Sequence, residues 1–535
     1  MITKDELLKT SNHERIWQKY CGFLDISLAE FMEIQEQLLM EQIELVFDSP
    51  LGRKFMPRRP KDISEFRQLV PLTTYDDYAA YLSEKNEDVL AAKPYCWGCT
   101  SGRGGTFKWV PYTERAVEKF ITLSAAMSIL ACANKKGDVN IASGVRMLYS
   151  LPPSPYMSGI LLRPSAELWD ARLVPPLDKY EGVDFATQIE AGFRIALRTG
   201  VDTLSALTSV LVKMGERFTE SSGQTKFNRS MLHPQTMWRL IMAWLRSKKQ
   251  GRALLPKDLW PLKGLICYGT DTAIYREQLI HYWGRVPFEI YAATEAGIIA
   301  FHAWNKKNMT FIPSYCFLEF IPEAEWLKNR ESKDYQPATI LLDEVEPGQR
   351  YEIIVTNFYG GAFLRYRLGD IIKIVALEDE EAGIKLPQMV FESRADGLID
   401  IAGFTRLDEK TIWQAIADTG IKFEDWTARK EYEGNETFVS LYIEPKQEIE
   451  VTELEGLIHQ KLVTINPDYR DLQNMLGIRP LRVTLLPAGS FQRYYEAKQK
   501  SGAHLAHLKP PHMNAPDTAI QNLVEIGAKP ARKEL

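Results

Sequence analysis

Apolar residues recur at helical spacing in the first quarter of the chain. Over residues 11–50 they repeat about every 3.6 positions until a turn rich in Ser, Pro and Gly, which predicts one long helix. Residues 63–82 predict a docking segment of two short helices, the second capped by Thr73 or Thr74. A further helical pattern covers residues 114–133.

Strand-like and helix-like segments alternate from residue 146 to residue 375. Short apolar and aromatic runs at 146–150, 264–268 and 286–291 are separated by helical segments such as 271–283. Such alternation is typical of α/β layers around a largely parallel sheet.

The pattern changes at Tyr351. Three strand candidates follow closely, at 351–357, 362–367 and 370–375, and they predict an antiparallel meander or part of a barrel.

A second α+β unit begins near residue 395. Helices are expected at about 408–418 and 451–463, and strands at 438–443 and 481–486, which suits a small lid of about 120 residues. The last residues are polar and contain proline, so we expect them to fray.

These patterns define the expected fold class, α/β (α+β). A large N-terminal domain, residues 1–392, would contain layered α/β sheets with a β-barrel-like part. A hinge would follow at 393–400, and a small mobile C-terminal α+β lid would occupy 401–535.

Composition indicates a large globular protein. The chain has 535 residues, 45% apolar and 25% charged, which excludes a disordered chain, a collagen and a disulfide scaffold. Its net charge of −5 predicts no long-range attraction to nucleic acid or anionic lipid, although a local basic pocket stays compatible with it. We therefore expect neither nucleic acid nor a membrane as a partner.

The cysteines and the N-terminus favour a reducing compartment. Six cysteines are too sparse for a disulfide framework. Cys96 and Cys99 form a C-x-x-C that could be half a zinc site or a redox pair, but no second such motif completes a four-ligand site, so a thiol pair beside a loop is favoured. The chain starts with charged residues and lacks a secretion signal or a membrane-length apolar run, which predicts a cytoplasmic location.

Residues 99–108 form the most informative local segment. Three glycines within four residues permit close approach of an anion, and Thr100, Ser101 and Thr106 add hydroxyl donors, so backbone N–H groups here could form a nest for phosphate oxygens. The segment matches neither a Walker A loop nor G-x-G-x-x-G. A plain glycine-rich turn is the alternative interpretation.

Residues 291–297 follow a predicted strand directly. Ligands of α/β sheets lie outside the carboxyl ends of strands, where an aromatic ring can stack on a base and Thr294 and Glu295 offer oxygens to Mg²⁺. The alternative is an ordinary helix start with Thr294 as its N-cap.

Two later segments are equally open to two interpretations. Asp370, at the end of Tyr366-Arg-Leu-Gly-Asp, could accept the two hydroxyls of a ribose, or the segment could be a plain hairpin turn. Arg394, Asp396 and Gly397 would suit a hinge, or an ordinary inter-domain turn.

Taken in order, these segments and a late lysine resemble the adenylate-forming enzyme superfamily. The closer resemblance is to its acyl acid–amido synthetase family, known from auxin-responsive plants as the Gretchen Hagen family. Residues 66–77 resemble the family segment ahead of the nucleotide loop, and residues 489–510 resemble its C-terminal signature. The likeness covers roughly residues 25–512, with 150–260 matched by position alone.

The resemblance implies an enzyme that uses ATP and Mg²⁺ to join a carboxylic acid to AMP and then passes the acyl group to an amine. The implied ATP- and AMP-binding residues are Thr100, Ser101, Gly102 and Gly104 for the phosphates, Tyr291, Ala292 and Ala293 for adenine, Thr294 for the α-phosphate, Asp370 for the ribose and Arg394 at the hinge. The implied catalytic residues are Glu295, which would also bind Mg²⁺, Arg406 and Lys509 from the lid.

Three positions depart from the family pattern. Arg103 stands in the loop where a small hydroxyl residue is usual, Ala292-Ala293 replaces a small polar pair, and His512 follows Pro511 where the family has arginine. Arg406 in turn keeps the charge of the family's lysine but changes its geometry. An altered acceptor or a lost activity therefore stays open.

The acyl pocket is expected between the helix after the loop and two strands. The residues that would line it are Phe120, Ser124, Met127, Tyr149, Tyr268 and Gly269. Mostly apolar or aromatic, they suit an aryl or medium-sized apolar acid, or they are simply core. His504, His507 and His512 invite a metal interpretation, but no carboxylate or cysteine completes the set locally, so polar lid surface is favoured.

The leading hypothesis is an acyl acid–amido synthetase acting on small-molecule acids and amines, usually amino acids, as a monomer or weak dimer. The first alternative is an acyl- or aryl-CoA ligase, which shares the first half-reaction. The second is a non-catalytic nucleotide-binding protein, favoured if Arg103 blocks the loop. A lid that turns between two states is a further expectation.

Overall fold

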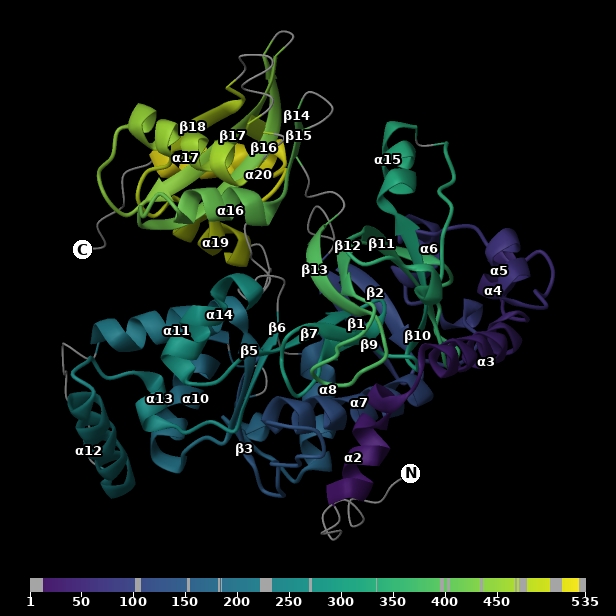
Figure 1. Cartoon of the computed structure of the whole chain (residues 1–535), viewed down its shortest axis with the longest axis horizontal. Helices are drawn as coiled ribbons and strands as arrows, with labels where there is room; N and C mark the ends of the chain where they lie inside the picture. The colour runs from purple at the N-terminus through teal and green to yellow at the C-terminus, as the bar shows by residue number, and fades with distance from the viewer. Residues whose placement is uncertain are drawn as a thin grey trace. The chain divides into compact units, whose positions relative to one another are not determined.

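The chain forms two compact units in a computed structural model (Figure 1), Met1–Glu392 and Ser393–Leu535. The residues described are 13–101, 107–151, 154–180, 183, 185–221, 233–268, 272–332, 334–394, 399–401, 405–433, 436–466, 469–470, 479–500 and 512–528. None of the helices in these ranges combines the length and the apolar character that crossing a bilayer needs.

The first unit is built on an 11-stranded sheet with the strand order β10-β11-β12-β13-β9-β8-β7-β6-β5-β3-β4. Its strands are β3 (Arg146–Ser150), β4 (Arg172–Val174), β5 (Thr203–Leu207), β6 (Gly264–Tyr268), β7 (Phe288–Ala293), β8 (Gly297–His302), β9 (Met309–Phe311), β10 (Cys316–Pro322), β11 (Arg350–Asn357), β12 (Tyr366–Ala376) and β13 (Gln388–Arg394). Strands β4, β3, β5, β6 and β7 are parallel. The antiparallel strands that the sequence grouped as a barrel-like part continue them in the same sheet.

Helices surround this sheet, and a separate hairpin carries the glycine-rich segment. The hairpin consists of β1 (Cys96–Ser101) and β2 (Phe107–Tyr112). The helices are α2 (His13–Cys21), α3 (Leu28–Val46), α4 (Pro50–Phe55), α5 (Ile63–Leu69), α6 (Asp76–Leu82), α7 (Glu114–Cys132), α8 (Met157–Leu168), α9 (Leu177–Tyr180), α10 (Phe185–Thr199), α11 (Thr208–Ser221), α12 (Pro234–Lys249), α13 (Pro256–Leu259), α14 (Thr272–Trp283) and α15 (Glu323–Glu331), with the 3₁₀ turns η1 (Gly22–Asp25), η2 (Glu87–Val89) and η5 (Leu342–Glu344).

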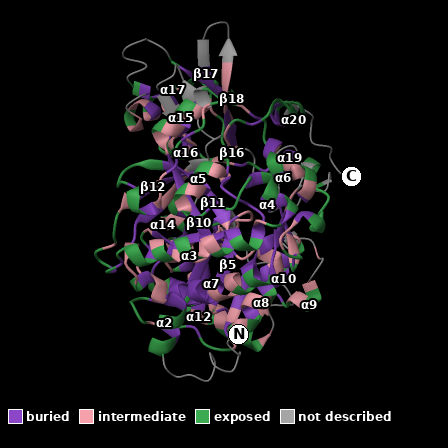
Figure 2. Cartoon of the chain, turned by 90° about the vertical axis from the view of Figure 1, so that its right-hand side faces the viewer, coloured by how far each residue is buried: buried purple, intermediate pink, exposed green. Residues whose placement is uncertain are grey.

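Helix α7 lies at the centre of the main core. Every residue from Leu123 to Cys132 is buried, and Figure 2 shows buried residues concentrated along this helix. The Thr113 hydroxyl caps the helix by accepting a hydrogen bond from the Ala116 N–H at 3.3 Å. The C-terminal half of the helix is buried on all sides and is therefore apolar all round, which explains its clear sequence pattern.

The prediction of one long helix over residues 11–50 is wrong, because the α-helix is interrupted between Gly22 and Ser27. The break is made by a capping box: the Ser27 hydroxyl accepts from the Glu30 N–H at 3.2 Å, and the Ser27 N–H donates to Glu30 Oε2 at 2.7 Å. Both unpaired N–H groups at the start of α3 are thereby satisfied, so a new helix begins there.

The N-cap residue of α6 is Tyr75, not Thr73 or Thr74, and its side chain makes no capping hydrogen bond. Thr74 is still tied to the first turn of the helix, because its N–H and its hydroxyl donate to Asp77 Oδ2 at 2.8 and 3.2 Å. Thr73 is instead buried beside β12, where its N–H donates to the Arg365 carbonyl at 2.9 Å and its carbonyl accepts from the Arg367 N–H at 2.8 Å. The docking segment thus adds one parallel β-bridge to the start of β12.

Strand β12 is one strand where the sequence predicted two. Its register against β11 shifts between Arg367 and Ile371, so that Leu368, Gly369 and Asp370 lie opposite the single residue Ile353. Gly369 has φ +73°, the left-handed conformation typical of a β-bulge. The hairpin-turn interpretation of this segment is therefore wrong, since Gly and Asp here form a bulge within a strand.

The second unit is α+β. Its three-stranded sheet joins β16 (Phe423–Glu433) to β17 (Glu436–Pro445) antiparallel and β17 to β18 (Leu481–Leu485) parallel. The remaining elements are the pair β14 (Ile399–Ile401) and β15 (Thr405–Leu407), and the helices α16 (Glu409–Ala417), α17 (Val451–Ile465), α19 (Ser490–Lys500) and α20 (Asp517–Ala528). The fold class predicted from sequence, a large α/β part and a smaller α+β part, is confirmed.

The expected fraying of the C-terminal residues is wrong for α20. Ile520 and Leu523 of this helix are buried against Phe491 and Tyr494 of α19 in a small separate core. One apolar face of α20 is enough to fix the helix, because its partner α19 presents two aromatic rings.

Candidate active site

Residues 294–296 form the tip of the β7–β8 hairpin. Ala293 pairs with Gly297 across this three-residue loop. Gly297 has φ +67°, and a Cβ there would lie 2.0 Å from a ring carbon of Tyr315, so only glycine fits. The helix start with Thr294 as N-cap is therefore wrong, because Thr294 and Glu295 lie in the loop of a β-hairpin.

The Glu295 carboxylate lies among groups from two other strands. Its Oε1 accepts a hydrogen bond from the Tyr366 hydroxyl at 3.4 Å and is 3.9 Å from Nζ of Lys108. The Glu295 backbone carbonyl accepts a hydrogen bond from Nδ2 of Asn357 at 2.8 Å, which ties the loop to strand β11. The side chain is 12% exposed, so the carboxylate is mostly but not fully buried.

Electrostatics keep Tyr366 a donor. Burial and the charge of Glu295 raise the pKa of the Tyr366 phenol far above its ordinary value. Burial also raises the pKa of Tyr112, whose hydroxyl donates to the Thr294 carbonyl. Both phenols therefore stay protonated and hold the hairpin loop by its side chain and its backbone.

A second carboxylate, Asp370, lies on the β12 bulge. The hydroxyl of Tyr291, a residue of β7, donates to Asp370 Oδ2 at 2.9 Å, and both side chains are buried. The Tyr291 ring also lies 6.0 Å from that of Phe391 on β13. The bulge turns Asp370 toward β7, although β7 and β12 are not neighbours in the sheet.

The glycine-rich hairpin lies beside the same loop. A Cβ added to Gly98 of β1 would come within 3.6 Å of the Thr294 methyl group, so the two backbones are close. Thr100 pairs with Lys108 across the hairpin, and Lys108 is the residue that faces Glu295. Three segments predicted separately, at 99–108, 291–297 and 366–370, thus come together.

An ion pair holds β12 in position at Tyr366. The Arg365 guanidinium donates to Glu319 at 2.8 Å and to the carbonyls of Arg67 and Val70 at 2.6 and 2.7 Å. Glu319 is 1% exposed and Arg365 7% exposed, so the charges are buried but fully paired. The docking segment is thereby tied to the residue next to Tyr366.

The residues expected to line the acyl pocket fall into two groups. Phe120 and Met127 of α7 belong to the main core, and the Ser124 hydroxyl donates back to the Ile121 carbonyl at 2.7 Å. Tyr149 belongs to a smaller cluster and accepts from Nε2 of Gln188 at 3.1 Å. Tyr268 packs against both groups, so it is the residue that joins them.

Several predicted site residues are described in part or lie outside the described residues. Thr100, Ser101, Arg394 and Arg406 are placed by backbone, in β1, β13 and β15. Those outside the described residues are Gly102, Arg103, Gly104, Gly269, His504, His507 and Lys509. Ala292 is exposed and Ala293 half-buried at the end of β7, beside Tyr291.

His512 is not polar lid surface. Its Nδ1 lies 2.6 Å from Glu409 Oε1, its Nε2 lies 2.8 Å from Asp425 Oδ1, and its ring stacks on Trp426 at 4.7 Å. Burial alone would lower the pKa of His512, but the hydrogen bonds to Asp425 and Glu409 outweigh it and raise the pKa to about 10. The imidazolium is therefore a fixed cation inside the second unit.

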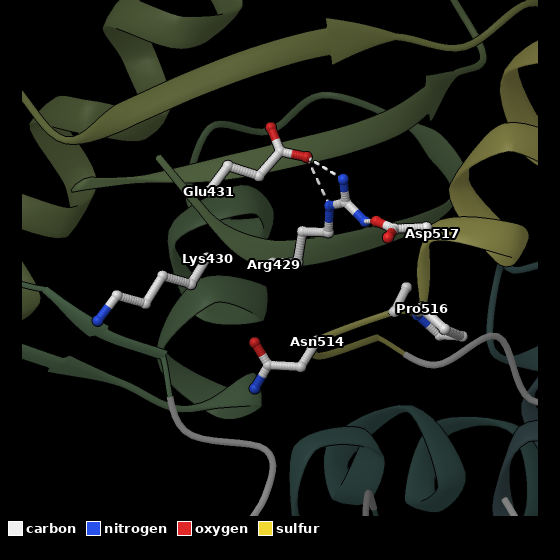
Figure 3. A pocket seen from close by; sticks show the side chains of 7 residues that line it. Arg429, Lys430, Glu431, Asn514, Pro516 and Asp517 are labelled. Carbon is white, nitrogen blue, oxygen red and sulfur yellow. Dashed lines mark hydrogen bonds and ion pairs between the residues drawn. The ribbon is translucent and has the colours of Figure 1, made fainter. Parts of the chain in front are cut away.

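An open groove of about 600 Å³ lies in the second unit, lined by Arg429, Lys430, Glu431, Asn514, Ala515, Pro516 and Asp517. Figure 3 shows Arg429 between Glu431 and Asp517, which it contacts at 2.5 Å each. None of the predicted site residues lines it. Its one arginine is neutralised by two carboxylates, and its other cationic side chain is Lys430.

Sequence reasoning assigned no role to Lys108, Tyr366, Tyr112 or Asn357. Lys108 closes the glycine-rich segment, and its position across from Thr100 was the available signal. Tyr366 opens the segment that ends in Asp370. Tyr112 and Asn357 left no signal, because each acts through a contact with a loop distant in sequence.

Comparison with known proteins identifies the class. Family models match residues 23–221 (GH3 family N-terminal domain), 309–394 (GH3 family central domain) and 409–517 (GH3 family C-terminal domain). The chain therefore belongs to the GH3 family, and the resemblance to the Gretchen Hagen family is confirmed.

Individual relatives fit this assignment. The jasmonoyl–L-amino acid synthetase GH3.5 of Oryza sativa subsp. japonica is 25% identical over 290 residues, which cover 49% of this chain and 47% of that protein. The match thus spans about half the length of this curated relative.

Two solved structures share the fold. AtGH3.15 acyl acid amido synthetase in complex with 2,4-DB has a TM-score of 0.72 at 18% identity, over 98% of this chain and 97% of that one. The 2-hydroxyisobutyryl-CoA ligase in its postadenylation state with 2-HIB-AMP has a TM-score of 0.61 at 15% identity, over 86% and 87% of the two chains.

Proposed function

We propose that this chain is an ATP-dependent ligase that activates a carboxylic acid as an acyl-adenylate and transfers the acyl group to an amine, forming an amide. Membership of the GH3 family supports the proposal. Its relatives include a jasmonoyl–amino acid synthetase and an acyl acid amido synthetase, which favours a small-molecule acid and an amino acid as substrates. The cytoplasm is the proposed location, and six free cysteines support it.

One observation carries the proposal: the carboxylate of Glu295 faces Lys108 and Tyr366 at the end of strands that also bring Tyr291 to Asp370. In the first step an oxygen of the acid bonds to the α-phosphorus of ATP, and the bond to pyrophosphate breaks. Charge builds up on the α-phosphate, where fixed cations and hydroxyl donors stabilise it best. Lys108 and the Thr294 loop would supply that stabilisation.

The same geometry supports the proposed roles of Asp370 and Tyr291 in binding the nucleotide. Asp370 would accept the ribose hydroxyls, with Tyr291 holding its second oxygen in place through the 2.9 Å hydrogen bond. Tyr291 is 6% exposed, so we propose that it mainly positions Asp370 while Ala292 and Ala293 line the adenine. Thr100, Ser101, Gly102 and Gly104 would hold the phosphates from the hairpin.

The carboxylate of Glu295 suits the role of a magnesium ligand. Mg²⁺ in nucleotide sites takes one or two carboxylates and fills its other positions with phosphate oxygens and water. A single, partly exposed carboxylate at the tip of a hairpin meets that need. When bound, the ion would neutralise phosphate charge and leave Lys108 to contact the same phosphates.

In the second step the acyl group passes from AMP to the amine. The amine attacks the acyl carbon, AMP leaves with the bonding electron pair, and the proton that the amine loses passes to water. Arg406 and Lys509 are proposed to come from the second unit, Lys509 in the adenylating arrangement of a hinged lid. Amide formation and CoA ligation share the first step. Because the chain also shares its fold with 2-hydroxyisobutyryl-CoA ligase, an acyl-CoA ligase is the second candidate function.

The test is pyrophosphate–ATP exchange with a library of carboxylic acids, followed by discharge of the preferred acyl-adenylate with amino acids or with CoA. Acid-dependent exchange and discharge by an amino acid are expected. Discharge by CoA alone would identify the ligase alternative. ATP binding without exchange for any acid would identify a non-catalytic nucleotide-binding protein.

A further inference from the structure

Helix α12 exposes an apolar face. Five of its side chains are each between 46% and 67% exposed, and they are Met237, Trp238, Ile241, Trp244 and Leu245. At 100° per residue they fall within an arc of about 120° centred on Ile241. The opposite face, with Thr236, Ala243 and Ser247, is the buried one.

The helix is held in this orientation by the protein itself. Arg239 donates to the Leu197 and Arg198 carbonyls, and Arg246 donates to the Asp258 carbonyl at 2.9 Å. These contacts fix α12 against α10 and α13 at the edge of the first unit (Figure 1). Two exposed tryptophans on a rigid helix are therefore a feature of the folded state.

The surrounding sequence is strongly basic. From Ser221 to Lys257 the chain has 37 residues with eight Lys or Arg and no Asp or Glu. One of the eight, Arg252, is paired with Asp258 just beyond this stretch at 2.7 Å. Lys248 and Lys249 end α12, and Lys248 Nζ lies 5.9 Å from the Trp244 ring centroid, beside the apolar face. The prediction of no membrane partner rested on the net charge of the whole chain, −5, which does not reveal this local excess of positive charge.

We propose that α12 is a peripheral binding site for the surface of an anionic phospholipid bilayer. Met237, Ile241 and Leu245 would enter the boundary between headgroups and acyl chains, and Trp238 and Trp244 would lie at headgroup level, as amphipathic aromatic rings prefer. Lys248 and Lys249 would contact lipid phosphates. The helix lies on the bilayer and does not cross it.

Charge and shape favour lipid over the other occupants. A second copy of this chain would bring two basic faces together, which like charges oppose. A nucleic acid would meet five apolar side chains where it needs cations, because its affinity comes mainly from phosphate neutralisation. An anionic bilayer satisfies both the apolar face and the lysines.

The experiment is co-sedimentation of the full chain with phosphatidylcholine vesicles that contain or lack phosphatidylglycerol. We expect binding to the anionic vesicles at least about tenfold tighter than to the neutral ones, weakening as salt is added. W238S/W244S should weaken it about tenfold or more, and K248E/K249E should do so for anionic vesicles alone. Leu377, 49% exposed elsewhere in the first unit, gives the matched control L377S, which should bind like wild type.

Folding is checked by circular dichroism and by the melting temperature, which should not fall because the changed side chains are exposed. Absence of vesicle binding by wild type, or equal binding by both α12 variants, would overturn the proposal. A dimer that W238S/W244S dissociates, without vesicle binding, would make this face a self-association surface instead. Retention of a DNA or RNA probe in place of vesicles would likewise overturn it.

Discussion

The hydroxyl of Tyr291 donates a 2.9 Å hydrogen bond to the carboxylate of Asp370, 79 residues later in the chain. One residue ends a strand that the sequence predicted, and the other lies on a bulge that it did not. Their contact joins the segment proposed for adenine to the segment proposed for ribose. The hydrogen bond also orients one carboxylate oxygen of Asp370 through the buried side chain of Tyr291.

Removing the Tyr291 hydroxyl tests this relationship. Tyr291→Phe keeps the ring and should raise KM for ATP about fivefold, the value of about 1 kcal/mol for one buried hydrogen bond. Asp370→Asn should raise it more, because it also removes the charge. Tyr335→Phe, which breaks another tyrosine–carboxylate bond of 2.6 Å to Glu325 away from the site, is the control and should leave KM unchanged.

Glycine 297 should be irreplaceable for the hairpin that carries Glu295. Gly297→Ala combines φ +67° with a Cβ 2.0 Å from the Tyr315 ring, whereas Gly348→Ala has φ +84° and open space around it. Backbone strain costs about 1 kcal/mol at each position, and overlap adds about 1–3 kcal/mol at Gly297 alone. Melting temperatures measured side by side should therefore fall further for Gly297→Ala, and equal losses would contradict the packing described.

His512 should make stability depend on pH in the alkaline range. Its pKa is raised from 6.5 to about 10 by Asp425 and Glu409, against the effect of burial. A raised folded-state pKa stabilises the protein fully below about pH 6.5 and loses that contribution as pH rises to about 10. His512→Gln should thus lower the melting temperature most at pH 6 and least near pH 10.

The control for His512 is His13→Gln, at an exposed position in the first unit. Its melting temperature should follow wild type at every pH. A difference between His512→Gln and wild type that stays constant from pH 6 to pH 10 would show that the imidazole acts by packing on Trp426 and not by its charge.

Lys509 should act in one half-reaction only. Lys509→Ala is expected to reduce pyrophosphate exchange by orders of magnitude, because a cation at the α-phosphate is lost, yet to spare amide formation from supplied acyl-adenylate. Lys446→Ala, on an exposed position of the second unit, is the control. Equal damage to both steps would argue against a lid that turns between them.

Much of the fold could be predicted because its core is regular. The helix α7 shows a clear helical pattern of apolar residues, and the strands β3 and β6 are short runs rich in apolar residues, so both kinds of element are detected from the sequence. Strand β16 was missed because its residues, from Phe423 to Glu433, are largely charged and polar. β16 forms a strand because it pairs with β17, and its own sequence pattern does not indicate this.

The breaks were harder to predict than the elements. The break between α2 and α3 depends on the hydrogen bonds between Ser27 and Glu30. The helical pattern of apolar residues continues on both sides of it and so hides the break. Gly369 and Asp370 read as a turn because these residue types favour turns, and only the pairing of β12 with β11 makes them a bulge.

The site was predictable in its segments and unpredictable in its contacts. The order of the motifs identified the family, which the comparisons confirm. That Lys108 faces Glu295 depends on the register of a hairpin, and that Tyr366 reaches it depends on an anchor at Arg365 and Glu319. Such contacts are made by residues far apart in sequence, so local patterns carry no trace of them.

Acid-dependent pyrophosphate–ATP exchange in wild type, Glu295→Gln and Glu277→Gln tests most directly whether Glu295 belongs to an adenylating site. Glu277 is exposed on α14, so its variant removes the same charge outside the proposed site. We predict exchange with at least one acid in wild type, the same rate in Glu277→Gln, and a loss of about a hundredfold or more in Glu295→Gln. Exchange that survives unchanged in Glu295→Gln would contradict the account.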